Sequence, residues 1–329
     1  MATTTTTVSG AGPVVGSRSF LSRLREGDEI ARLITFLFAA SVVLLTFLLV
    51  FELWRGSVLP RHTFGFSFFR TSIWDPVFDQ FGALPFIYGT LVTSAVALLV
   101  AVPLGLGAAI FLAELAPLRL SDTLEFFIDL LAAVPSVIYG LLGIFIVVPL
   151  MRQVVQPLLK QYLGFLPLFK GPAFGLGFLT AGVVLAIMII PYIISVSREI
   201  LLSVPRDQRE AALALGSTRW ESTWKIVVPF ARGGILGSIF LALARALGET
   251  MAVTMVIGNT PVISASLLSP GDSIASVIAS QFKEATGELY TQSLIELGLV
   301  LFLLTLILNG LARLMIVITS QRGSGMGHV

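Results

Sequence analysis

The chain has 329 residues, of which 56% are hydrophobic and 12% are charged, and its mean hydropathy is +0.94. So little polar surface cannot cover a soluble globule of this length, so the composition indicates a membrane protein. The 21 basic and 19 acidic residues provide no broad basic surface, so we expect no nucleic-acid partner. The absence of Cys excludes disulfides and thiol chemistry, and two His residues argue against a metal site.

The N-terminal 32 residues, rich in Thr, Gly and Arg, predict a flexible cytoplasmic tail. The next apolar run is too long for a signal peptide and lacks a small-x-small cleavage site, so 33–54 predicts an uncleaved first transmembrane helix. Five further apolar runs lie within 81–320, and each reaches the ~20 residues needed to cross a bilayer. The six runs are 33–51, 81–113, 130–151, 171–197, 233–258 and 294–318. They predict an all-α membrane protein with six transmembrane helices.

Charge distribution and prolines add detail to this arrangement. With both termini in the cytoplasm, 13 Lys and Arg residues fall inside and seven outside, and this bias supports an even number of spans with the N- and C-termini both cytoplasmic. Pro103, Pro135 and Pro191 fall inside apolar runs and predict kinks. We expect the Tyr139 hydroxyl to satisfy backbone groups freed near Pro135.

Four acidic residues lie in or beside the first predicted cytoplasmic loop: Glu114, Asp122, Glu125 and Asp129. No nucleophile–base pair or set of metal ligands accompanies them in the apolar runs. We therefore interpret them as solvated loop charges, and we expect no catalytic residue and no metal site in this chain.

The loop 203–232 between the fourth and fifth runs is rich in helix-forming residues. Residues 206–215 predict a helix that Gly216 ends, and 218–227 predict a second short helix before Pro229. The loop therefore predicts a helix-turn-helix element on the cytoplasmic face, where mixed apolar and charged side chains suit a protein interface. A solvated surface helix is the alternative.

Six residues at fixed spacing in this loop carry a family resemblance. They are Glu210, Ala211, Ala212, Gly216, Ile226 and Pro229. Together they resemble the EAA loop of ABC importer permeases, whose pattern is E-A-A-x3-G-x9-I-x-L-P, with Val228 where Leu is usual. The resemblance implies the type I (MetI-like) permease fold, in which this loop forms coupling helices that dock into a separate ATPase.

The resemblance also assigns roles within the loop. It implies that Glu210 makes a polar contact with the ATPase, that Ala211 and Ala212 pack closely, and that Gly216 makes the turn. The chain has no G-x-x-x-x-G-K-[ST] phosphate-binding loop. We therefore expect it to be a transport subunit that binds no cofactor, while the partner ATPase uses ATP and Mg²⁺.

Two charges interrupt the fifth apolar run, Arg245 and Glu249. Each charge near the centre of a bilayer costs about 2.5–3.5 kcal/mol, so such residues face protein or water. Their i, i+4 spacing predicts one helical face, with Ser238 two turns earlier on the same stripe. One interpretation is an anion pathway, because the guanidinium fork matches oxyanion oxygens. The alternative is a structural ion pair that fixes helix packing.

Two further segments resemble the permeases of phosphate-specific (Pst) importers. Residues 244–253, A-R-A-L-G-E-T-M-A-V, are similar to the R-A-x-G-E-T-M-A-V segment of that family, and the T-M-A-V ending is typical of the C-type (PstC-like) subunit. Residues 132–140, A-A-V-P-S-V-I-Y-G, are similar to a second family segment. The resemblance implies that the chain transports inorganic phosphate across the bacterial inner membrane.

The same resemblance implies four kinds of partner besides membrane lipid. They are a second, PstA-like permease subunit, a PstB-like ATPase dimer, a PstS-like extracytoplasmic phosphate-binding protein, and inorganic phosphate itself. Two alternatives remain open at this point. One is an ABC permease for another oxyanion such as sulfate or molybdate. The other is an anion channel or proton-coupled secondary carrier that uses Arg245 and Glu249 as a gate or relay.

Overall fold

The computed structural model describes residues 28–324, with side chains over 29–317, in two units divided between Glu52 and Leu53. The predicted flexible tail lies mostly outside the described residues. Six helices in the described part are long and apolar enough to cross a membrane, and the all-α prediction is confirmed. They are Glu29–Arg55, Leu84–Leu115, Ser136–Leu163, Phe178–Leu202, Arg219–Leu247 and Glu288–Val317.

The first helix, α2 (Asp28–Arg55), makes up the whole described part of the first unit. Apolar side chains surround it on every face, and residues 30–49 are all exposed. A helix that is apolar all round suits a lipid environment rather than a soluble surface. This element therefore agrees with the predicted first transmembrane helix.

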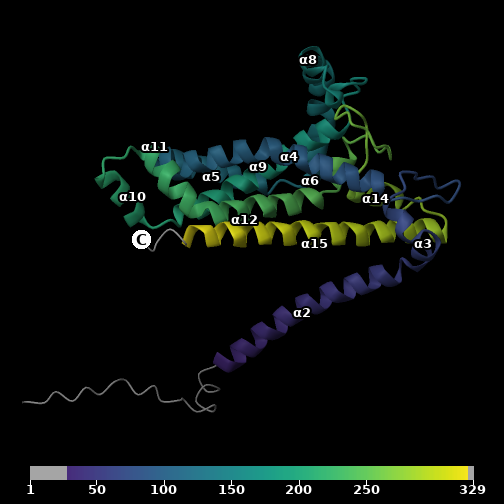
Figure 1. Ribbon diagram of the computed structural model, residues 1–329, viewed down its shortest axis with the longest axis horizontal. Coiled ribbons are helices and arrows are strands. Elements are labelled where there is room, and N and C mark those ends of the chain that lie inside the picture. The colour runs from purple at the N-terminus through teal and green to yellow at the C-terminus, as the bar shows by residue number, and fades with distance from the viewer. Residues whose placement is uncertain (1–27, 325–329) are drawn as a thin grey trace, which may run out of the picture. The chain divides into compact units, whose positions relative to one another are not determined.

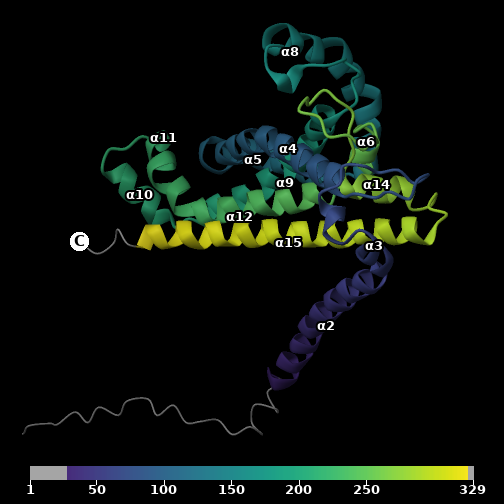
Figure 2. The ribbon, with the colours of Figure 1, turned by 45° about the vertical axis from the view of Figure 1, so that its right-hand side comes forward.

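The second unit is built around α9 (Phe178–Leu202), the most buried of its long helices. It packs most extensively against α4 (Leu84–Ile110), and α12 (Val228–Leu247) packs against both α9 and α4. α15 (Glu288–Ser324) lies beside α12 in both views (Figures 1 and 2). Small residues allow the close approach, since a Cβ on Gly182 of α9 would lie 2.4 Å from Val96 Cγ1 of α4.

The region between α4 and α9 differs from the prediction. α4 continues through a π-helical turn, η2 (Phe111–Leu115), and is followed by a separate amphipathic helix, α5 (Leu118–Ala132), where a loop was expected. The third span begins only at Ser136. It comprises α6 (Ser136–Leu142), η3 (Gly143–Val147), α7 (Val148–Leu150), η4 (Met151–Val155) and α8 (Gln156–Leu163).

Pro135 therefore breaks the chain between two helices instead of kinking one. The ring of a proline disfavours helical dihedral angles in the residue before it. Pro135 itself is extended, with ψ 141°. The Tyr139 hydroxyl donates to the carbonyl oxygen of Leu131 across this break at 2.8 Å, as expected. Pro103 and Pro191 lie inside α4 and α9, as predicted.

Short elements mark the two ends of the second unit. α10 (Arg206–Ala214) and α11 (Arg219–Ser222) lie at one end, together with the C-terminal end of α15 (Figure 1). The opposite end carries α3 (Val58–Thr63), η1 (Gly65–Phe69) and α14 (Ile274–Gln281). η5 (Pro167–Phe169) follows α8, and α13 (Met251–Thr254) follows α12. The predicted coupling loop is thus separated from the α14 end by the length of the bundle.

Candidate functional site

The helix that carries Arg245 ends before Glu249. α12 stops at Leu247, and Gly248, which costs about 1 kcal/mol in a helix interior, leads into the non-helical residues before α13. Glu249 Oε1 instead accepts a hydrogen bond from the Ala252 amide at 3.1 Å. The predicted continuous span over 233–258 is therefore wrong. So is the shared helical face, and Arg245 and Glu249 form no ion pair with each other among the described residues.

Arg245 has an exposed side chain on the last turn of α12. Its guanidinium carbon lies 5.9 Å from the centre of the Tyr192 ring on α9, a cation–π distance. The ring holds the side chain against α9 without consuming its N–H donors. The guanidinium therefore offers a planar set of donors of the kind that matches an oxyanion.

Ser238 lies on the same stripe of α12 but is only 1% exposed. Its hydroxyl donates to the Ile235 carbonyl oxygen at 2.8 Å and lies 2.7 Å from the Ser197 hydroxyl of α9. These bonds tie α12 to α9 and use the only proton that Ser238 can donate. An anion contact for Ser238 stays a prediction, and the geometry here supports a packing role.

The coupling loop folds locally as its turn chemistry predicts. α10 ends in a Schellman motif: Gly216 has φ +84°, its amide donates to Leu213, and the Ser217 amide donates to Ala212. Thr218 and Glu221 then form a capping box that starts α11. The second short helix does not end before Pro229, which corrects the prediction. It passes through the π-helical η6 (Thr223–Val227) into α12, because the wider turn accommodates the missing proline N–H.

The residues that resemble the EAA loop divide by exposure. Glu210 and Ala211 have exposed side chains, whereas Ala212 is 2% exposed and packs within the chain. Ile226 is half-buried and Pro229 is exposed. Glu210 and Ala211 are thus open to a partner, and their roles in ATPase contact stay predictions.

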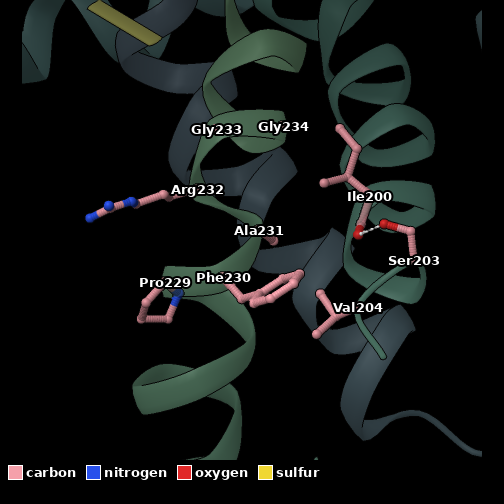
Figure 3. A pocket seen from close by; sticks show the side chains of 9 residues that line it. All are labelled: Ile200, Ser203, Val204, Pro229, Phe230, Ala231, Arg232, Gly233 and Gly234. Atoms are coloured by element: carbon pink, nitrogen blue, oxygen red, sulfur yellow. Dashed lines mark hydrogen bonds between the residues drawn. The ribbon is translucent and has the colours of Figure 1, made fainter. Parts of the chain in front are cut away.

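A pocket of about 540 Å³ lies where the coupling loop joins the bundle, between the end of α9 and the start of α12. Its lining comprises Ile200, Ser203, Val204, Pro229, Phe230, Ala231, Arg232, Gly233 and Gly234. In Figure 3 the Phe230 ring points toward Val204, whereas Arg232 points away from α9. The pocket wall therefore combines apolar side chains with polar groups such as the Ser203 hydroxyl, and Pro229 of the loop pattern contributes to it.

Two of the four acidic residues interpreted as solvated are in fact ion-paired. Glu114 binds Arg209 of α10 at 2.8 Å, and Glu125 binds Arg198 of α9. The side chains of Glu114 and Arg209 are only 10% and 19% exposed. One feature of the sequence indicates a shared contact surface, because Ser121, Glu125 and Asp129 recur every four residues on one face of α5. Their hydrogen-bond partners on α9, Ser195 and Arg198, lie 66 to 77 residues away, and no local pattern identifies them.

Asp272 is a buried carboxyl that sequence reasoning missed. It is 1% exposed, Oδ1 accepts from the Ser273 amide at 2.8 Å, and Oδ2 has no partner. Burial raises the pKa of Asp272 to about 7, against the smaller lowering effects of the Ser276 hydroxyl and the Ser273 amide. Its sequence context, P-G-D-S, is typical of an exposed turn, so nothing local indicates burial.

Comparisons with known proteins agree over most of the chain. The profile of a family described as "Binding-protein-dependent transport system inner membrane component" matches residues 101–317. A protein of Mesorhizobium japonicum described as "Phosphate transport system permease protein PstC" is 47% identical over 284 residues, covering 84% of this chain and 87% of the relative. A Xylella fastidiosa protein with the same description is 50% identical over 262 residues, covering 78% and 81%.

Two solved structures share the fold at low sequence identity. An inward-facing MetNI methionine ABC transporter matches with a TM-score of 0.53 and 15% identity, covering 75% of this chain and 99% of that chain. A bacterial alginate ABC transporter, in complex with an alginate-bound periplasmic protein, matches with a TM-score of 0.57 and 15% identity, covering 89% and 96%. These likenesses concern the arrangement of the helices.

Proposed function

We propose that this chain, which belongs to the family of binding-protein-dependent transport system inner membrane components, is the subunit through which inorganic phosphate passes in an ATP-driven importer. It is a multi-pass inner-membrane transport subunit with the type I importer permease fold, as predicted. The observation that carries phosphate as cargo is the identity of 47–50% to relatives named as phosphate permeases, over about four-fifths of this chain.

The anion pathway that we propose runs past Arg245. Its exposed guanidinium, held over Tyr192, attracts an oxyanion, and its N–H fork binds two phosphate oxygens at once. Glu249, with one oxygen bonded to the α13 backbone, keeps a second carboxylate oxygen that can accept a hydrogen bond from a protonated phosphate. Sulfate, which is fully deprotonated at neutral pH, lacks that proton.

Energy comes from a separate ATPase in this proposal. The exposed Glu210 and Ala211 of α10 dock on an ATPase dimer, which binds ATP and Mg²⁺, while this chain binds neither. Both chain ends face the cytoplasm in this proposal. A second permease subunit completes the pathway, and an extracytoplasmic binding protein delivers phosphate to the opposite end.

The direct test is uptake of labelled phosphate in cells with and without this gene, with and without depletion of ATP. We expect deletion to remove an ATP-dependent component that excess sulfate or molybdate does not inhibit. Loss of sulfate or molybdate uptake, with phosphate uptake unchanged, would keep the permease and reassign its cargo. Uptake that follows membrane potential and ignores ATP would indicate a channel or a secondary carrier.

A further inference from the structure

Arg209 of α10 binds two transmembrane helices at once. Its Nη1 and Nη2 atoms donate to the carbonyl oxygens of Val204 and Leu201, at 2.6 and 2.7 Å, where α9 ends. Nη2 and Nε also donate to the Glu114 carboxylate, at 2.8 and 3.2 Å. Glu114 lies in η2, the π-helical turn that continues α4. One guanidinium therefore joins α10, α9 and the end of α4.

The chemistry of this junction requires an arginine. Carbonyl groups at the C-terminal end of a helix carry partial negative charge, so they favour a cation. Only a guanidinium has a planar fork with enough donors to reach two carbonyl groups and a carboxylate together. Arg209 uses four of its five N–H groups in this way, through bonds to Leu201, Val204 and Glu114.

The joined helix α9 also contacts the residue that we place in the anion pathway. Tyr192 of α9 lies beneath the Arg245 guanidinium, and Ser197 of α9 bonds Ser238 of α12. A displacement of the end of α9 therefore reaches α12 through side chains that are already in contact. Such a physical chain of contacts is what coupling between two distant sites requires.

We propose that Arg209, held by Glu114, is the positioning residue that transmits movement of α10 to α4 and α9 together. The inference rests on the proposed function, because α10 moves only if an ATPase displaces it. Charge-assisted hydrogen bonds are strong and directional, so Arg209 keeps α10 attached to α9 and α4 whether α10 moves toward them or away from them. Packing of Ala212 alone opposes only movement of α10 toward them.

The chain offers a matched control in the ion pair between Arg198 and Glu125. This pair joins α9 to α5 with similar chemistry but does not touch α10. Its Arg and Glu side chains are 11% and 35% exposed. Weakening it tests whether any lost ion pair near α9 impairs transport, or only the pair that holds the coupling helix.

The experiment uses the complete importer, reconstituted in liposomes with its partner subunits, and measures phosphate uptake and ATP hydrolysis together. Arg209→Lys keeps the charge but cannot bond both carbonyls and the carboxylate, and Glu114→Gln removes the counter-charge. We expect both variants to assemble and hydrolyse ATP while uptake per ATP falls about tenfold, within the usual range of coupling between sites. Glu125→Gln should lower the melting temperature but keep the native ratio of uptake to hydrolysis.

Two results would overturn the inference. One is a native ratio of uptake to hydrolysis in both Arg209→Lys and Glu114→Gln. The other is a parallel loss of hydrolysis and uptake, because it would assign Arg209 to ATPase docking or to assembly. Failure of the proposed function is distinguishable from both, since the unaltered importer would then show no ATP-dependent phosphate uptake.

Discussion

Replacing Asp272 with Asn should shift stability in favour of the variant as pH rises. Asp272 is 1% exposed and its Oδ2 has no partner, so ionisation in the folded state is unfavourable. Its pKa is raised from 3.8 to about 7 by burial. Between these two pH values the folded protein binds one proton more than the unfolded chain. Stability contributed by this group is therefore lost as pH rises from about 4 to about 7, and the loss is constant above that.

The size of the effect follows from the two pKa values. A shift of one pKa unit is worth about 1.4 kcal/mol, so the stability lost relative to low pH is about 4 kcal/mol at pH 8 and about 2 kcal/mol at pH 5, where Asp272 is ionised only in the unfolded chain. Asn keeps an oxygen that can accept from the Ser273 amide, and its NH₂ group replaces the oxygen that lacks a partner. That buried NH₂ carries a penalty of about 1–3 kcal/mol, which does not change with pH. The pH dependence thus isolates the carboxyl.

The assay is thermal unfolding of the purified protein in detergent at pH 5 and pH 8. We expect the stability difference between Asp272→Asn and the native chain to rise by about 2 kcal/mol between these pH values. Asp122→Asn, on an exposed position of α5, is the matched control for removal of one carboxylate. A difference that stays the same at both pH values, or that falls as pH rises, would refute the assignment of a proton to buried Asp272.

Three further outcomes test the pathway and the packing. Arg245→Gln should abolish phosphate uptake with membrane insertion intact, and undiminished uptake would remove Arg245 from the pathway. Gly89→Ala should cost about 2–3 kcal/mol and reduce the amount of folded protein, because its Cβ would lie 1.8 Å from the Asp272 carbonyl oxygen. Gly107→Ala on the same helix meets no atom within 4 Å and should raise the melting temperature slightly; equal effects of the two would contradict the packing. Gly216→Ala should cost about 1–2 kcal/mol in coupling-loop stability, since φ is +84° there, and proteolysis of the loop should detect it unless the turn rearranges.

Local properties of the sequence account for the six apolar helices. Each span depends on the summed transfer free energy of about 20 neighbouring residues, a quantity that needs no knowledge of the fold. The coupling-loop turn is equally local, because Gly216 can adopt a positive φ and Thr218 with Glu221 can cap the next helix whatever lies nearby. The permease fold and family were not read from these local properties; the resemblance of the coupling loop and of residues 244–253 to known permeases implied them.

Contacts between distant segments account for the rest. Glu114 and Arg209 are 95 residues apart, and an acidic residue in a loop gives no local sign that a guanidinium will be brought to it. The break after Leu247 was hidden for a related reason, since one Gly lowers helix propensity too little to end a helix without support from its surroundings. Burial of Asp272 likewise arises where its backbone packs against Gly89 of α4. Hydropathy and turn chemistry thus determined which segments cross the membrane, whereas only the tertiary structure decided which charges are paired, buried or open, because those states depend on neighbours distant in the chain.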